Sequence, residues 1–274
     1  ESKDTFFNKR NLTTYKLLKL GTSLQTIQKR TISLKEKNVL IKVKLISDKK
    51  IAAVLGTKKG NVERFSIYKV NESTNYWEEE KGYDLNSYKI ELKKNDKEWI
   101  SRNISISPNG DHLTYTTLDA HRIKVLSFGN GVNLKELKFN FHGGIYQQFF
   151  DKKGEVIIFS DRHGSVGTLH LRDFPETRGG YLEPYREPMI YGPLKNGTYI
   201  IPGKSKDIYL LDPLNPEKTR KSSLSLCTKM AIDYCKDGKS FHVLGHNEKT
   251  LALGLNEESN KEENGSKLLI LLNY

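Results

Sequence analysis

The chain has 274 residues, of which 36% are hydrophobic and 10% aromatic, enough to bury the core of one large domain or two small ones. Its 45 Lys and Arg against 33 Asp and Glu give a net charge of +12, and its two cysteines cannot make a disulfide framework. This charge is spread along the chain, so it indicates either attraction to nucleic acid, anionic membranes and acidic partners, or a surface that is simply rich in Lys.

Short strands are predicted along the whole chain in a repeating order of strand, turn, strand, short polar turn and strand. Two strands, 14–20 and 26–34, precede the first repeat. In chain order the repeats place strands at 39–46, 51–56 and 62–70; at 99–106, 112–117 and 122–128; at 144–150, 155–160 and 166–171; at 187–192, 198–203 and 208–212; and at 228–234, 240–245 and 250–255. A strand at 266–274 closes the chain.

A weaker fourth strand follows the third in several repeats. It is predicted at 88–94 and 134–141, and less clearly at 221–226. Outer strands that face solvent carry little of the core, so a blurred apolar pattern is expected there. Two irregular segments interrupt the pattern: an insertion at 71–84, and a Pro- and Gly-rich loop at 172–188 in place of a regular outer strand.

A glycine marks the first turn of four repeats. Gly110 of "SPNG" is followed by Gly154, Gly197 and Gly238 at intervals of 44, 43 and 41 residues, and a version without glycine ends at Lys50. The composition of "SPNG" favours a tight reversal between two strands. A period in the low forties is typical of a four-stranded propeller blade.

The repeat predicts an all-β fold, a single β-propeller of four-stranded antiparallel blades that extends over residues 1–274. We expect six blades, with seven as the alternative. Regular repeats cover about 36–255. Residues 1–35 and 256–274 are expected to complete the closing blade, since a propeller that pairs strands from both termini removes its exposed edges.

Several short motifs resemble those of the WD40 family. Residues 141–171 look like a degenerate WD40 repeat, with a Gly-His-like pair at His142 and Gly143 and an Asp-Gly-like turn at 161–164. "SPNG" is similar to the "SPDG" of that family, and Leu211 with Asp212 stands in the place of its Trp-Asp pair. The chain departs from the family at its tryptophans: neither occupies that place, and Phe65, Leu126 and Leu211 are the expected substitutes. Another propeller family with "SPDG" turns fits as well.

The sequence predicts no catalytic site, cofactor or metal. His121, His163 and His246 occupy the same turn of different repeats, and this arrangement is explained better by solvated turns or structural hydrogen bonds than by a metal-binding ring. Cys227 and Cys235 lack the spacing of a zinc site. Neither a nucleophile elbow nor a phosphate-binding Gly-Lys-Ser/Thr loop is present.

Partner binding is the remaining function, and the WD40 resemblance places it on the turns of the blades. The basic candidates at the second turns are Lys58, Lys59, His121, Arg122, Arg162, His163, Lys204 and Lys206. In the loop 172–188, Tyr181, Tyr185 and Arg186 have the composition of an interface anchor, or else they cover the neighbouring blade. In the insertion 71–84, Trp77 either offers a docking point or belongs to a tip without a role.

These observations predict a non-catalytic, WD40-like scaffold subunit of a larger intracellular assembly, nuclear or cytoplasmic, with a ribonucleoprotein favoured by the charge. Its partners are expected to be other protein subunits. One alternative is direct binding of RNA, DNA or an anionic lipid by a basic face; another is a propeller enzyme or a secreted ligand-binding module. No 18-residue apolar run occurs, so no transmembrane contact is expected, and two cysteines favour a reducing compartment.

Overall fold

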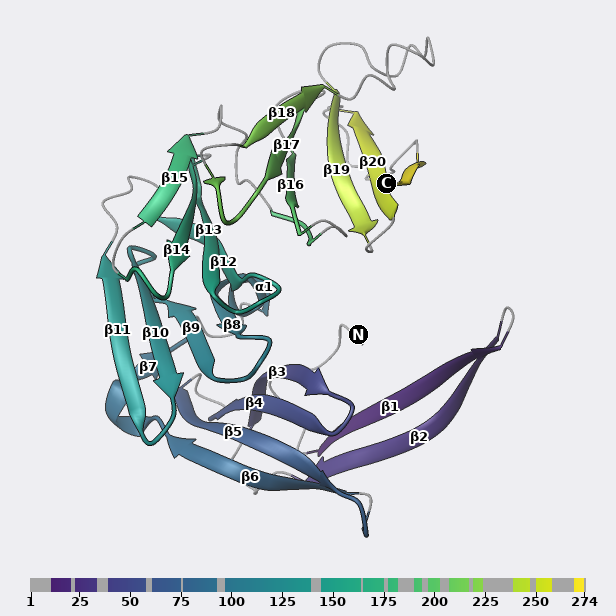
Figure 1. Cartoon of the computed structure of the whole chain (residues 1–274), viewed down its shortest axis with the longest axis vertical. Coiled ribbons are helices and arrows are strands. Elements are labelled where there is room, and N and C mark those ends of the chain that lie inside the picture. Colours follow the sequence, from purple (N-terminus) through teal and green to yellow (C-terminus); the bar gives the residue numbers. More distant parts are fainter. Residues whose placement is uncertain are drawn as a thin grey trace. The chain divides into compact units, whose positions relative to one another are not determined.

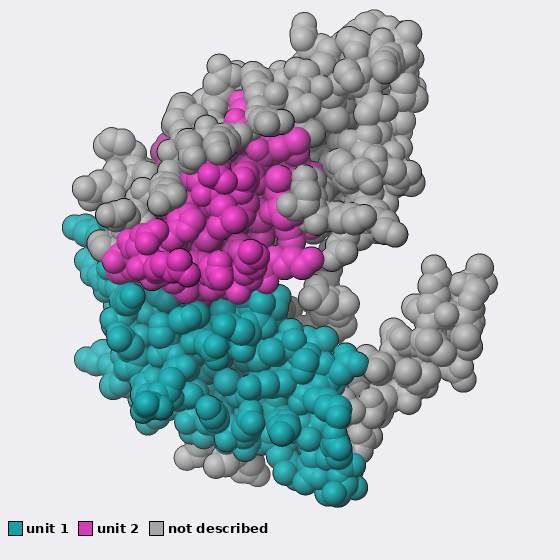
Figure 2. Space-filling model, in the orientation of Figure 1, with its two compact units in different colours: residues 1–138 teal, residues 139–274 magenta. Residues whose placement is uncertain are grey.

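Strands account for most of the described chain, and each pairs antiparallel with a strand that is close to it in sequence (Figure 1). The computed structural model describes residues 11–20, 23–33, 39–57, 61–74, 76–92, 97–138, 144–163, 165–174, 177–181, 190–193, 197–202, 207–216, 219–223, 239–246, 250–257 and 269–273. The chain divides into two units, residues 1–138 and 139–274, and each is described by itself (Figure 2).

The first unit contains three antiparallel sheets. A two-stranded sheet consists of β1 (Asn11–Leu20) and β2 (Ser23–Ser33). The next has the order β3 (Val39–Ser47), β4 (Lys50–Gly56), β5 (Asn61–Asn71) and β6 (Tyr76–Asp84), and β7 (Ile90–Glu91) also pairs with β5. The third consists of β8 (Ile104–Ile106), β9 (His112–Thr116), β10 (Arg122–Phe128) and β11 (Val132–Lys138) in sequential order.

Three more antiparallel sheets are described in the second unit, again with their strands in sequential order. One consists of β12 (Ile145–Phe150), β13 (Val156–Asp161), β14 (Ser165–His170) and β15 (Thr177–Tyr181). The second contains β16 (Tyr199–Pro202), β17 (Asp207–Leu211) and β18 (Arg220–Ser223). The third contains β19 (Lys239–His246), β20 (Thr250–Glu257) and β21 (Leu269–Asn273).

Successive antiparallel meanders of up to four strands are the blades of a β-propeller, and this confirms the predicted fold class. The number of blades and the closing blade built from both ends of the chain stay predictions. In the described part of the chain, no helix is long and apolar enough to cross a membrane. The helical segments found there are η1 (Asn86–Tyr88) and α1 (Lys97–Asn103).

The predicted turn glycines show why the repeat recurs. Gly110, Gly154 and Gly197 have φ of +79°, +78° and +83°, a left-handed conformation that glycine adopts without the steric cost of a Cβ. The amide of Gly110 donates to the carbonyl of Ser107 at 3.0 Å, and the amide of Gly154 donates to the carbonyl of Asp151 at 3.2 Å. The spacing of these glycines therefore reports a repeated backbone turn. Gly238 lies outside the described residues.

The core of the first unit joins the sheets β3–β7 and β8–β11. Phe65 of β5 is fully buried and stacks on Phe128 of β10, with ring centroids 4.1 Å apart and planes 4° apart. Trp99 and Ile100 of α1 belong to the same buried cluster, with aliphatic and aromatic residues from both sheets. In the second unit, a separate cluster joins β13 and β14 to β16 and β17, and includes Tyr199 and Ile201.

Three predictions in the first unit were wrong. Residues 99–106 do not form one strand: α1 ends at Asn103, whose side-chain amide donates to the carbonyl of Trp99 at 3.0 Å, and only Ile104–Ile106 is extended. Residues 71–84 are not simply an insertion, because β6 within them pairs along β5 as the fourth strand of its sheet. The strand predicted at 88–94 is correspondingly reduced to the two residues of β7.

Two predictions in the second unit also need correction. Part of the loop predicted at 172–188 is the outer strand β15, which pairs with β14. The strand predicted at 187–192 is represented in the described residues by a single bridge between Tyr191 and Ile200. The strand predicted at 228–234 lies outside the described residues.

Candidate functional site

The turn between β9 and β10 is held rigidly by its own hydrogen bonds. The amide of Thr117 donates to the carbonyl of Arg122 at 3.0 Å, and the amide of Ala120 donates to that of Thr117 at 2.8 Å. The Asp119 carboxylate accepts the Thr117 hydroxyl and, at 3.1 Å, the amide of His121. The hydrogen bond from the Thr117 hydroxyl and, to a smaller degree, that from the His121 amide lower the pKa of Asp119 and keep it ionised. His121 and Arg122, both predicted to bind a partner, are thus carried by an ordered turn.

The cations beside this turn are paired with carboxylates of the same sheet. Arg122 Nη1 lies 3.1 Å from Glu136 Oε1, and Arg122 Nε lies 4.0 Å from Asp119 Oδ2. Lys124 Nζ lies 3.2 Å from the other oxygen of Glu136. Arg122 and Lys124 of β10 therefore share one carboxylate of β11, which offsets part of their positive charge.

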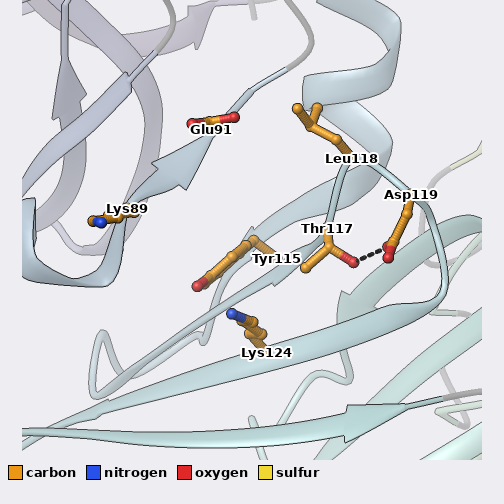
Figure 3. A pocket seen from close by; sticks show the side chains of 7 residues that line it. All are labelled: Lys89, Glu91, Tyr115, Thr117, Leu118, Asp119 and Lys124. Atoms are coloured by element: carbon orange, nitrogen blue, oxygen red, sulfur yellow. Dashed lines mark hydrogen bonds between the residues drawn. The ribbon is translucent and has the colours of Figure 1, made fainter.

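A pocket of about 270 Å³ opens next to this turn. It is lined from one side by β7 and the residue before it, and from the other by β9, β10 and the turn between them (Figure 3). The lining residues are Lys89, Glu91, Tyr115, Thr117, Leu118, Asp119 and Lys124. Both sides of the pocket belong to the first unit.

Tyr115 forms the inner wall of the pocket. It is 4% exposed and its ring belongs to the core, yet its hydroxyl has no hydrogen-bond partner among the described residues. Lys124 faces Tyr115 across the β9–β10 pair, and Glu136 faces Lys124 on β11. Burial, and secondarily the Glu136 carboxylate, raises the pKa of Tyr115. The phenol therefore stays protonated at neutral pH and can donate a hydrogen bond.

Two strained residues flank the same pocket. Lys89 has φ of +46° and Ala120 has φ of +60°, and among the described residues these are the two non-glycine positions with positive φ. Lys89 follows η1 as its left-handed C-cap, and its amide donates to the carbonyl of Asn86 at 3.3 Å. A left-handed conformation costs an ordinary residue about 1–2 kcal/mol, so the surrounding structure must hold both residues in place.

In the second unit, an aspartate also accepts backbone amides in the turn between β13 and β14. The Asp161 carboxylate accepts the amides of His163 and Ser165, both at 2.8 Å. Arg162 and His163 are exposed on this turn, as their predicted binding role requires. That role stays a prediction.

Of the other predicted site residues, Trp77 is buried, and the side chains of the rest lie outside the described part of the chain. Trp77 does not present its ring to a partner: it is 6% exposed and packs against Leu40, Ile51 and Val70, whereas the neighbouring Tyr76 is 60% exposed. Tyr181 is the last residue of β15, opposite Ser165, and its side chain lies outside the described part. The remaining predicted residues also lie outside it: Lys58, Lys59, Lys204, Lys206, Tyr185 and Arg186.

Several pocket residues were not among the sequence candidates. Tyr115 and Lys124 lie on two predicted strands. Because only a short turn connects these strands, the sequence indicated that they pair and that the two residues could face each other. Lys89 carried no signal, because its place depends on a left-handed cap that the sequence does not mark. Over the part of the chain that is described, no group of three or more His, Cys, Asp or Glu side chains is arranged to hold a metal ion.

Comparison with known proteins gives distant structural likenesses. No known family matches the chain, and no curated protein matches its sequence. Among solved structures, Hsv2 from Kluyveromyces marxianus shares 11% identity at a TM-score of 0.45, over 84% of this chain and 65% of that one. Hsv2 from Kluyveromyces lactis shares 10% identity at a TM-score of 0.46, over 91% of this chain and 75% of that one. The chain thus spans slightly less than two thirds of the first of these proteins, and its assignment as a propeller rests on its own strand pairing.

Proposed function

We propose that this chain is a non-catalytic, WD40-like interaction module, a scaffold subunit of a larger intracellular assembly in the nucleus or cytoplasm. The turn between β9 and β10, with the pocket beside it, is the surface that binds a protein partner. The observation that carries this proposal is the position of both left-handed non-glycine residues around one pocket: Lys89 lines it, and Ala120 directly follows its lining residue Asp119. Strained backbone of this kind is concentrated at binding and active sites, where the cost is offset by function.

The charge pairing at the turn favours a protein partner over nucleic acid. A phosphate backbone attracts cations that have no other counter-charge, whereas Arg122 and Lys124 already share Glu136. Leu118, in the same turn, has 49% of its surface exposed. An exposed apolar side chain in a turn that also carries paired charges fits a protein interface, which combines apolar and polar groups.

The proposal is tested by recovering partners of the tagged full chain from native extract. We expect a stoichiometric set of proteins that survives nuclease and survives salt raised well above about 150 mM, because packed interfaces are screened much less than exposed charges. Recovery that collapses with nuclease or with salt would refute a protein scaffold and indicate nucleic acid bound through the basic faces.

A pair of leucine variants locates the surface. Leu118→Asp places a charge at the turn, and Leu45→Asp does the same on β3, where the side chain is 59% exposed. We expect Leu118→Asp to reduce partner recovery about tenfold or more, as for a residue central to an interface, while Leu45→Asp leaves recovery unchanged. Equal recovery by both variants would place the partner elsewhere on the chain.

A further inference from the structure

We propose that the pocket beside the β9–β10 turn receives the carboxylate of an acidic side chain, Asp or Glu, from the partner. The Tyr115 hydroxyl donates to that carboxylate, and the ammonium groups of Lys89 and Lys124 donate to it as well. This inference rests on the proposed function, because it assigns the chemistry of the group that the interaction surface binds.

The Tyr115 hydroxyl provides the first reason. A buried polar group without a partner costs about 1–3 kcal/mol, so a hydroxyl in that state is rarely kept without a use. This hydroxyl belongs to a ring that the core fixes, and Figure 3 shows its oxygen directed into the space between β7 and β9. The protonated phenol is a donor, and no described residue offers it an acceptor. A carboxylate oxygen is the strongest acceptor that a protein partner can offer.

The two lysines provide the second reason. Lys89 is exposed at the rim of the pocket, and no carboxylate of the described residues forms an ion pair with it. Lys124 lies across the strand pair from Tyr115 and uses one direction for Glu136. An ammonium group has three donors, so Lys124 can hold Glu136 and a second carboxylate together. The left-handed backbone at Lys89 fixes the position from which its side chain reaches the pocket.

Size and charge indicate a single carboxylate and not a larger or more highly charged group. Pockets that enclose small-molecule ligands usually span about 300–1,000 Å³, and this one, at about 270 Å³, suits one side chain. Its lining carries Glu91 and Asp119 as well as the two lysines, so the formal charges balance. A phosphate dianion would meet two carboxylates at close range, whereas a monoanion can approach on the side of the lysines and the phenol.

The test uses the full-length chain and defined peptides. The chain is titrated into a fluorescent decapeptide of alternating Glu and Gly, and binding is followed by anisotropy. Two further peptides have Gln or phosphoserine in place of Glu. Tyr115→Phe removes the hydroxyl but keeps the ring, and Lys89→Gln removes the charge at the rim. The matched controls are Tyr88→Phe, whose hydroxyl donates to the carbonyl of Val132 at 3.0 Å, and Lys44→Gln on β3. Melting curves establish that each variant is folded.

We expect the Glu peptide to bind and the Gln peptide not to bind. Tyr115→Phe and Lys89→Gln should each weaken binding about tenfold, the usual effect of losing a hydrogen bond or ion pair to a charged group, while both controls bind as the unaltered chain does. Binding that is unaffected by Tyr115→Phe and Lys89→Gln would overturn the inference, as would failure of the Glu peptide to bind. Tighter binding of the phosphoserine peptide would overturn the choice of carboxylate.

Partner recovery separates the two proposals. If Tyr115→Phe and Lys89→Gln recover the same proteins as the unaltered chain, the carboxylate pocket is wrong while the scaffold stands. If no variant and no unaltered chain recovers a partner, the scaffold itself is wrong.

Discussion

Replacing Gly110 by Ala tests the turn on which the repeat is built. Gly110 is buried at φ of +79°, and a Cβ added there would lie 2.4 Å from Ile46 Cδ1. The left-handed conformation costs Ala about 1–2 kcal/mol. Pushing the Ile46 methyl aside adds an overpacking cost of about 1 kcal/mol, and the stiffer unfolded chain returns about 0.4–1 kcal/mol. We therefore expect the free energy of unfolding to fall by about 2 kcal/mol.

Urea unfolding followed by circular dichroism measures this change, with Gly129→Ala as the control. Gly129 lies in the same unit, its φ is outside the left-handed range, and a Cβ there would meet nothing within 4 Å. We expect Gly129→Ala to change the free energy of unfolding by less than about 0.5 kcal/mol. Equal effects of Gly110→Ala and Gly129→Ala would refute the reasoning that strain at the turn makes the glycine necessary.

A second substitution separates strain from crowding. Ile46→Val removes the methyl group that the new Cβ would meet, and alone it costs about 0.5–1.5 kcal/mol. In the Gly110→Ala background it should cost less, because it also relieves the clash. Additive losses would show that the backbone conformation alone accounts for the effect of Gly110→Ala.

Two more predictions concern the first unit. Phe65→Leu and Phe128→Leu should be non-additive, with a coupling of about 0.5–1.5 kcal/mol in urea unfolding, because the rings stack at 4.1 Å; additive losses would contradict the stacking. Burial, and to a smaller degree Lys135, lowers the pKa of His112 against the opposing effect of Asp111. The unfolded chain therefore binds a proton that the folded chain resists, and the free energy of unfolding should fall as the pH drops below about 6.5. In His112→Asn this part of the pH dependence should disappear, and an unchanged pH profile between about pH 7.5 and 5.5 would refute the assignment to His112.

The fold was predictable where local chemistry repeats. Gly110, Gly154 and Gly197 share a positive φ, and the first two close the same hydrogen-bonded reversal, so the spacing of the glycines pointed to the repeat. The failures lie where no local rule applies. In α1, Trp99 and Ile100 are consecutive apolar residues that fit a buried strand as well as a short helix, and the choice depends on the core they enter.

Strand β6 was missed for a related reason. Its side chains are largely exposed apart from Trp77, and three successive glutamates give no alternating pattern. The backbone pairing with β5 creates the strand, and sequence periodicity does not report backbone pairing. The same limit applies to the candidate site: His121 and Arg122 could be placed at a turn, whereas the position of Lys89 at the pocket of Tyr115 depends on its left-handed cap of η1.

The two described second turns distinguish what the fold requires from what the site adds. Asp119 and Asp161 each accept the amide of the histidine two residues later, so the carboxylate belongs to the turn and recurs with it. Ala120 has positive φ, whereas Arg162, which also follows its aspartate directly, does not. The two connections differ in length, because residues 117–122 join the paired ends of β9 and β10 and residues 161–165 join those of β13 and β14. The strain at Ala120 therefore belongs to the connection that borders the pocket, as expected if the pocket is the reason for keeping it.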